Sequence, residues 1–254
     1  MHFNHAGALV TGGASGLGYG VSEAVVNAGG RVVMLDAQRQ RGEQAAAQLG
    51  NAALFIETNV TSPSSVDEAV THAIAWLGQC NLLVNCAGIC HSQRVLGKHG
   101  LMPVQDFTQQ VEVNLNGSFY LCRTLIEHMQ DNDADEHGQR GVIVNTASIA
   151  AYEGQQGQSG YAASKGGVVS LILPLAREYA RFGVRVMGIA PGLFATPMFD
   201  QLPSEARESL VAQVPFPARA GHAKEFAALV EHIFYNPMLN GEVIRLDAAL
   251  RMNT

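Results

Sequence analysis

The chain has 254 residues, of which 47% are hydrophobic and 15% charged, with a formal net charge of −6. This charge gives no broad basic surface for nucleic acid or an anionic membrane. No apolar stretch reaches the roughly 18 residues that a membrane span needs. The length suits one α/β domain over residues 1–254. The first predicted strand begins too early for a targeting peptide, so we expect a cytoplasmic protein.

A glycine-rich loop follows the first predicted strand, residues 6–11, and leads into a helical pattern from Val21. Gly12, Gly16 and Gly18 let the backbone turn sharply and approach a pyrophosphate closely. The free N–H groups and positive dipole at the helix N-terminus favour an anion. Strand, glycine loop and helix together predict a dinucleotide-binding site.

The second predicted strand, residues 31–35, ends at Asp36. Its distance from Gly18 is close to the spacing of about 20 residues expected for the acid that binds the adenosine ribose. The carboxylate would accept hydrogen bonds from a diol and repel a 2′-phosphate, which favours NAD over NADP. Arg39 keeps NADP as the minor alternative, and capping of the next helix is the structural alternative for Asp36.

Helices and strands continue to alternate, which predicts a parallel sheet with helices on both faces. After the strand at 81–85, the small residues Cys86, Ala87 and Gly88 would let the adenosine half of a cofactor lie against the backbone. The four cysteines have no C-x-x-C spacing, so we expect reduced thiols. No metal site is predicted. The predicted elements of this region are a helix at 39–49, a strand at 53–56, a helix from 63 to about 77 and the strand at 81–85.

A long helix is predicted from about Val104 to Met129, with Asn114 near its middle. Asparagine is a poor helix former and costs free energy when buried unpaired. Asn114 is therefore a candidate site residue, with a structural hydrogen bond as the equal alternative. The polar segment 131–141 that follows is expected to be a solvated loop.

A serine, a tyrosine and a lysine follow the short apolar strand predicted at 141–146. Ser148 lies just past the strand's carboxyl end, and Tyr161 and Lys165 are four residues apart on one face of the next helix. The ammonium would lower the phenol's pKa and make it a usable acid or base, while the Ser148 hydroxyl would hold the substrate oxygen. Taken alone, the Tyr/Lys pair also fits an ordinary helix surface.

The strand predicted at 184–190 ends at Pro191 and Gly192 and leads into an apolar, poorly periodic segment, 193–220. Ligands of open α/β sheets bind beyond the strands' carboxyl ends, so this segment suits a substrate lid. Packing against a partner subunit is the equal alternative. A helix at 223–235 and a strand at 242–247 complete the predicted elements.

Together, TGGASGLG, Asp36, NCAG at 85–88, Asn114, Ser148, YAASK at 161–165 and PG at 191–192 resemble the short-chain dehydrogenase/reductase family over nearly the whole chain. The resemblance implies a Rossmann-type sheet of about seven strands, a homotetramer and hydride transfer between a secondary alcohol and nicotinamide. Ser148 would hold the substrate oxygen, Tyr161 would exchange its proton, Lys165 would bind the nicotinamide ribose and Asn114 would hold a relay water. The residues implied in cofactor binding are Gly12, Ser15, Gly16, Leu17, Gly18, Asp36, Asn59, Val60, Cys86, Ala87, Gly88, Tyr161, Lys165, Pro191, Gly192, Phe194 and Thr196.

Longer segments, among them GQRGVIVNTAS and QVPFPAR, resemble family members that act on 3-hydroxyacyl-CoA thioesters. They imply NAD-dependent oxidation to 3-oxoacyl-CoA, with Gln155 and Gln158 lining the substrate site. A steroid or other secondary-alcohol dehydrogenase, a 3-oxoacyl thioester reductase and a non-catalytic dinucleotide sensor are the alternatives. A long loop after Gly88 carries Lys98 and His99, which could meet CoA phosphates, although a solvated loop is the stronger reading.

Two positions depart from the family pattern. Asn59 stands where relatives commonly have Asp. Asp247-Ala248 replaces the frequent Asp-Gly near the C-terminus. The first bears on cofactor affinity and the second on subunit contacts.

Overall fold

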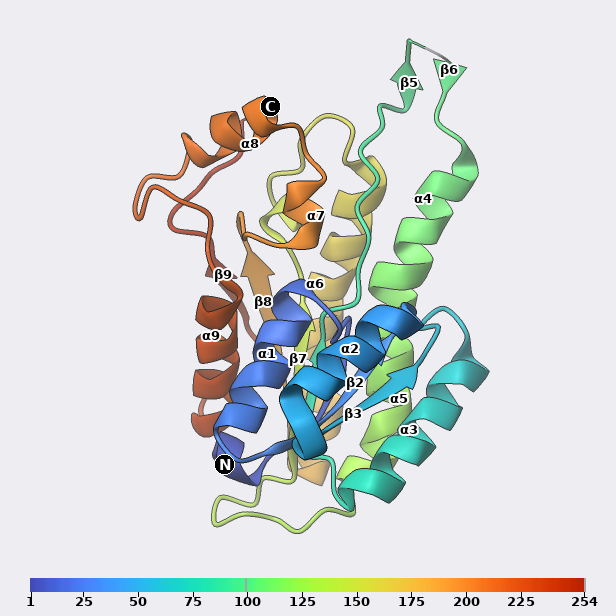
Figure 1. Ribbon diagram of the computed structural model, residues 1–254, viewed down its shortest axis with the longest axis vertical. Coiled ribbons are helices and arrows are strands. Elements are labelled where there is room, and N and C mark those ends of the chain that lie inside the picture. The colour runs from blue at the N-terminus through green and yellow to red at the C-terminus, as the bar shows by residue number, and fades with distance from the viewer. Residues whose placement is uncertain (99, 254) are drawn as a thin grey trace.

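A computed structural model describes residues 1–98 and 100–253 and places seven parallel strands in one sheet (Figure 1). Across the sheet the order is β3-β2-β1-β4-β7-β8-β9, with every neighbouring pair parallel. This doubly wound, Rossmann-type α/β arrangement confirms the predicted fold class. The strands are β1 (Gly7–Thr11), β2 (Arg31–Asp36), β3 (Ala53–Glu57), β4 (Leu82–Asn85), β7 (Gly141–Thr146), β8 (Val184–Pro191) and β9 (Val243–Leu246).

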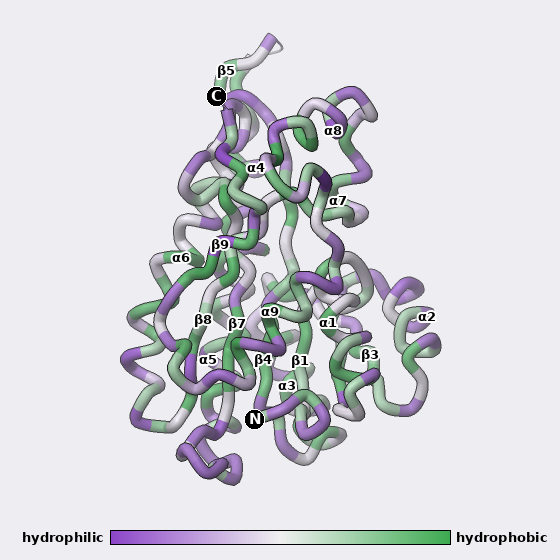
Figure 2. Tube along the Cα trace, turned by 90° about the vertical axis from the view of Figure 1, so that its left-hand side faces the viewer, coloured by the Kyte–Doolittle hydropathy of each residue, from purple (hydrophilic) through white to green (hydrophobic). Residues whose placement is uncertain are grey.

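Helices cover both faces of the sheet because neighbouring strand residues point to opposite faces. Val10 of β1 belongs to one buried cluster, with residues of α1, α2 and α9. Leu9 belongs to the other, with residues of α3, α5 and α6. Figure 2 shows hydrophobic residues along the strands and polar ones in the outer loops. The helices are α1 (Gly16–Asn27), α2 (Arg39–Leu49), α3 (Pro63–Leu77), α4 (Val104–Val111), α5 (Gly117–Met129), α6 (Ser159–Tyr179), α7 (Pro197–Asp200), α8 (Ser204–Val211) and α9 (Ala223–Tyr235).

The helix predicted from about Val104 to Met129 is interrupted by a π-helical turn. Residues Glu112–Asn116 form this turn between α4 and α5. Asn114 lies within it and is completely buried, at 0% exposure. Single π turns occur frequently at functional sites, and this one coincides with the candidate asparagine.

The segment after Gly88 rises to a short hairpin of β5 (Leu96–Gly97) and β6 (Gly100–Leu101), which projects beyond α4 in Figure 1. Lys98 is exposed at its turn. His99, the second residue of the predicted CoA contact, lies outside the described residues. The predicted lid, 193–220, contains the short helices α7 and α8.

The segment 131–141 is more ordered than predicted, because Gln139 is buried, at 6% exposure. The Asp135 carboxylate accepts the backbone N–H of Gln139 at 2.9 Å and its side-chain amide at 2.8 Å. Gln139 Oε1 in turn accepts Nε of the buried Arg185 at 2.7 Å. The guanidinium also donates to the carbonyls of Leu239 and Phe234, at 2.7 and 3.0 Å. The loop therefore closes over a buried cation that the sequence pattern did not reveal.

Candidate active site

The glycine loop between β1 and α1 has the backbone that an anion-binding turn needs. Gly12 and Gly16 have φ of 61° and 55°, in the left-handed region that favours glycine. A Cβ on Gly12 would lie 2.9 Å from the Ala87 nitrogen, and one on Gly18 would lie 2.3 Å from the Gly12 oxygen. Ser15 is the N-cap of α1, and its hydroxyl makes no capping bond within the described part of the chain. The first N–H groups of α1 are thus free to bind a phosphate.

Asp36 lies at the carboxyl end of β2, directly beside this loop. Its carboxylate accepts the backbone N–H of Ala14 at 3.3 Å and that of Gln38 at 3.0 Å. The first bond ties β2 to the glycine loop. The second reaches Gln38, the N-cap residue of α2, and not an N–H inside that helix, so Asp36 does not cap α2. Arg39 is turned toward Glu57, with Nε and Oε2 2.7 Å apart.

The segment after β4 forms the other side of the predicted cofactor site. The buried Thr11 hydroxyl accepts the N–H groups of Cys86 and Ala87, at 3.1 and 3.0 Å. Sequence reasoning missed Thr11, although a polar residue at the end of an apolar strand was a usable signal. Asn59 is exposed, and its Oδ1 accepts both donors of Thr61, at 3.0 and 2.9 Å.

Val60 lies behind this segment and is buried, at 9% exposure. It packs against Gly117, where a Cβ would lie 2.9 Å from Val60 Cγ2. Gly88 faces the π turn and α6, since a Cβ on it would lie 3.3 Å from Asn114 Oδ1 and 3.6 Å from Lys165 Nζ. The segment Cys86–Gly88 after β4 thus joins the predicted adenosine end of the site to the predicted nicotinamide end.

Ser148, Tyr161 and Lys165 are brought together beyond the carboxyl end of β7. Ser148 follows that strand, and its Oγ accepts the Ala150 N–H at 3.1 Å. Its hydroxyl is also close enough to Tyr161 to lower the pKa of the phenol. Tyr161 lies in the first turn of α6, and Lys165 Nζ is 5.9 Å from the centre of its ring. Lys165 is buried and donates to the Thr146 carbonyl at 2.6 Å. Three groups that could hold and protonate one substrate oxygen therefore lie close together beyond the carboxyl end of β7.

The pKa of Tyr161 differs in direction from the sequence prediction. Burial raises the pKa of Tyr161 to about 12, and the hydrogen bond with Ser148 opposes that rise. Among the described residues, Lys165 does not contribute the expected lowering of this pKa, and its ammonium donates to the Thr146 carbonyl. Burial also lowers the pKa of Lys165 to about 8. Desolvation therefore sets the direction of both pKa shifts.

Asn114 is fully engaged by the protein. Its Oδ1 accepts the Ile89 N–H at 2.8 Å, and its Nδ2 donates to the Ile89 carbonyl and to Ser164 Oγ, each at 2.9 Å. Ser164 is a further residue that sequence reasoning missed, and it lies directly before Lys165. The hydrogen-bonding alternative for Asn114 is confirmed, while its role in holding a relay water stays a prediction.

The base of the predicted lid lies against the glycine loop. Gly192, which follows Pro191 at the end of β8, donates its N–H to the Leu246 carbonyl at 3.0 Å. Phe194 is buried, edge-on to Phe226. Thr196 caps α7 by accepting the Phe199 N–H at 3.4 Å. A Cβ on Gly16 would lie 3.4 Å from Thr196 Cβ. Thr196 and the half-buried Leu17, which follows Gly16, therefore both lie at the carboxyl ends of the strands.

Gln155 and Gln158 lie in one loop, but their side chains bond within the protein. Gln158 Oε1 accepts the Gln155 N–H at 3.1 Å, and Gln155 Nε2 donates to the Asn253 carbonyl at 3.1 Å. The same loop carries Glu153, which bonds Arg245 at 2.8 Å. Their predicted substrate contacts stay predictions.

The C-terminal departure has a structural consequence. Ala248 has φ of 51° and Ala249 has φ of 63°. Both values lie in the left-handed region, which glycine occupies at lower cost. The Asp-Ala pair thus keeps the backbone turn of an Asp-Gly pair but adds strain.

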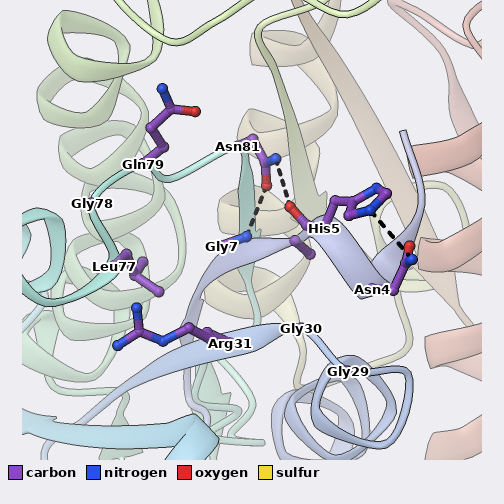
Figure 3. Close-up of a pocket in the computed structure, with 11 residues that line it drawn as sticks. Asn4, His5, Gly7, Gly29, Gly30, Arg31, Leu77, Gly78, Gln79 and Asn81 are labelled. Carbon is purple, nitrogen blue, oxygen red and sulfur yellow. Dashed lines mark hydrogen bonds between the residues drawn. The ribbon is translucent and has the colours of Figure 1, made fainter.

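Two cavities among the described residues are lined by side chains other than the Ser/Tyr/Lys set. One, of about 420 Å³, lies at the opposite, amino edge of the sheet and includes Asn4, His5, Gly7 and Asn81 (Figure 3). Asn81 bridges its wall, accepting the Gly7 N–H at 3.0 Å and donating to the His5 carbonyl at 3.1 Å. The other, of about 200 Å³, lies under the lid beside Phe194. The predicted catalytic residues therefore lie at the carboxyl ends of the strands and not in the larger of these two cavities.

Comparisons with known proteins place this geometry in a family. Residues 6–207 match the model of short chain dehydrogenases. The chain is 48% identical to 3-hydroxyacyl-CoA dehydrogenase type-2 of Homo sapiens, over 96% of this chain and 95% of that protein. The structure of 3-hydroxyacyl-CoA dehydrogenase type-2 from Mycobacterium avium is 39% identical, with a TM-score of 0.93 over 99% of this chain and 98% of that one.

A second solved structure is 3-ketoacyl-(acyl-carrier-protein) reductase from Brucella melitensis, complexed with NADH. It is 28% identical, with a TM-score of 0.86 over 96% of this chain and 98% of that chain. The family model and the identity to the human relative agree with the motifs and with the observed fold. The chain belongs to the short-chain dehydrogenase family.

Proposed function

We propose that the protein is an NAD-dependent dehydrogenase that oxidises 3-hydroxyacyl-CoA thioesters to 3-oxoacyl-CoA. The observation that carries this proposal is the meeting of Ser148, Tyr161 and Lys165 beside the glycine loop. The acyl-CoA substrate is supported by the names of the human and mycobacterial relatives.

The residues present fit a bound dinucleotide, which would take the hydride from the carbinol carbon. The glycine loop and the first turn of α1 would hold its pyrophosphate, and Asp36 its adenosine ribose. Ser148 would hold the substrate hydroxyl, and Tyr161 would take its proton as the carbonyl forms. Lys165 would bind the nicotinamide ribose and favour the phenolate that Tyr161 needs in order to act as a base.

Asp36 is proposed to select NAD over NADP. Arg39, the residue that kept NADP as an alternative, is paired with Glu57 on the exposed surface. Asp36→Asn should lower the selectivity for NAD by at least about tenfold, because the charge that repels a 2′-phosphate is lost. The measurement is kcat/KM with each cofactor. Asp131→Asn, an exposed change in the loop before β7, is the matched control, and unchanged selectivity in Asp36→Asn would contradict the assignment.

The pH dependence should follow the raised pKa of Tyr161. Below the pKa, the phenolate fraction that accepts the alcohol proton grows about tenfold per pH unit. Oxidation should therefore accelerate about 100-fold between about pH 6 and pH 8. Above about pH 8, where Lys165 loses its proton, the slope should decrease. Initial rates with substrate and NAD below their KM values report these groups in the free enzyme. A pH-independent rate would argue against a phenol base, and Lys165→Met should remove the change of slope.

The substrate is tested by NADH formation with purified protein and a panel of short 3-hydroxyacyl-CoA thioesters, a 17β-hydroxysteroid and simple secondary alcohols. The highest turnover on an acyl-CoA would support the proposal. Turnover restricted to CoA-free alcohols would favour a steroid or other alcohol dehydrogenase, and efficient reduction of 3-oxoacyl thioesters with NADPH would favour a biosynthetic reductase. NAD binding without turnover would favour a sensor.

Three further features belong to this proposal: a substrate lid, a homotetrameric assembly and a cytoplasmic location. Segment 193–220 is proposed as the substrate lid, because its base contacts the glycine loop through Thr196. A homotetramer is proposed as the assembly, supported by the exposed apolar side chains Phe119 on α5 and Leu173 on α6.

Free thiols suit the proposed cytoplasmic location. No helix within residues 1–98 and 100–253 combines the length and the hydropathy of a membrane span.

A further inference from the structure

Gln110 is a buried polar side chain in the last turn of α4 that none of the roles above includes. It is 1% exposed. Its Oε1 accepts the His91 N–H at 3.0 Å, and its Nε2 donates to the Asp106 carbonyl at 3.0 Å. A buried amide left without hydrogen-bond partners destabilises the fold, so these two bonds fix the side chain in one place. Gln110 thereby ties the segment after β4 to α4.

Asn114 makes the equivalent attachment one turn further along the same helix. It accepts the Ile89 N–H at 2.8 Å. The two amides therefore hold both ends of the three-residue segment Ile89–His91. Cys90 lies between the two attachment points and is near Tyr161 and Lys165. Burial raises the pKa of Tyr161 and lowers the pKa of Lys165. Cys90 adds to the first shift and opposes the second, so it lies close to both groups.

The same two amides also contact α6 at two positions one turn apart. A Cβ on Gly160 would lie 2.6 Å from Gln110 Nε2, so this glycine allows the amide to approach the backbone of α6. Asn114 Nδ2 donates to Ser164 Oγ at 2.9 Å. Gly160 directly precedes Tyr161, and Ser164 directly precedes Lys165. Each amide thus joins the segment after β4 to the residue before one member of the proposed catalytic pair.

We propose that Gln110 is a positioning residue that, with Asn114, sets the distance between the segment Ile89–His91 and the Tyr161/Lys165 face of α6. The proposal rests on the function proposed above for Tyr161 and Lys165. Without Gln110, the His91 end of the segment is released while Asn114 still holds the Ile89 end. The segment Ile89–His91, which carries Cys90, then shifts relative to α6. Turnover depends on the alignment of the reacting groups, so a small displacement lowers it strongly.

The test compares Gln110→Met with the exposed neighbour Gln109→Met. Methionine has nearly the shape of glutamine but makes neither hydrogen bond. Turnover of Gln110→Met should fall about 10- to 100-fold on any substrate that the wild type oxidises. The Kd for NADH should stay within about twofold, because the glycine loop is untouched. Unchanged kcat, or equal losses in kcat and in NADH affinity, would overturn the proposal.

A second variant separates positioning from folding. In Gln110→Glu, a protonated carboxyl can accept from His91 and donate to Asp106, as the amide does, whereas a carboxylate cannot donate. Burial favours the protonated form, so turnover relative to wild type should rise at least about fivefold from pH 8 to pH 5.5. A ratio that does not change with pH would overturn the proposal. The Gln110→Glu variant also provides the test if Gln110→Met fails to fold.

Hydrogen exchange at the His91 amide gives a readout that needs no substrate. In Gln110→Met this amide should exchange at least about tenfold faster than in the wild type, and in Gln109→Met at the wild-type rate. Protection that is unchanged by Gln110→Met would overturn the proposal. A wild type that is inactive on every substrate would count against the proposed function, while the exchange result would still decide whether Gln110 holds the segment.

Discussion

Tyr161→Phe is expected to reduce turnover by about 10²- to 10⁴-fold, the usual contribution of a general acid or base. The change removes one oxygen from a half-buried side chain and leaves the ring in place. Neither the glycine loop nor Asp36 contacts the lost hydroxyl, so the Kd for NADH should be unchanged. NADH formation measures turnover, and NADH fluorescence in a titration measures binding.

Tyr235→Phe is the matched control for this change. Tyr235 ends α9, is 54% exposed and lies against His2, with ring centres 4.8 Å apart. Its hydroxyl should be dispensable for turnover. Activity retained in Tyr161→Phe at the level of this control would refute the catalytic assignment. Loss of NADH binding in Tyr161→Phe would instead indicate that the phenol holds the cofactor.

Arg185→Leu is expected to have the largest effect on stability, lowering the free energy of unfolding by about 2–4 kcal/mol. The change leaves three acceptors without their donor: Gln139 Oε1 and the carbonyls of Leu239 and Phe234. Each unsatisfied buried group costs about 1–3 kcal/mol. Part of this cost is offset because the buried charge is removed, and burial already lowers the pKa of Arg185 to about 10.

Thermal denaturation measures this effect. A loss of 2–4 kcal/mol corresponds to about 5–15 °C in Tm for a chain of this size. Arg177→Leu, an exposed change on α6, is the control and should leave Tm nearly unchanged. Equal Tm values for the two variants would show that the loop 131–141 and the end of α9 do not depend on the guanidinium.

The fold was predictable because its signals are local and repeated. Buried parallel strands such as β7 are short β-branched runs, and Gly12 to Gly18 define the first strand-to-helix turn. Strand ends agree within about two residues, the usual uncertainty of an element boundary. The order of elements along the chain also places Ser148 and Tyr161 at the same end of the sheet, where the carboxyl ends of the parallel strands meet.

The rest of the site depends on contacts between distant segments. Burial around Tyr161 sets the direction of its pKa shift, and no local spacing reveals how many atoms surround a phenol. The attachments of Thr11 to Cys86, and of Gln110 to His91, join elements far apart in the chain. Arg185 lies near the start of β8, and its burial depends on the distant loop that carries Gln139. These were missed because a sequence pattern contains one hydrogen-bonding group but not its distant partner.

The π turn at Glu112–Asn116 bears on how chains of this kind are compared. A π turn holds one more residue per hydrogen-bonded loop than an α turn, so the helix accommodates a single inserted residue without losing its course. A relative without a need for an amide at this position could omit that residue and keep a regular helix. A one-residue gap between 112 and 116 in an alignment would then mark a change in the chemistry of the site, and the helix around it would be unaltered.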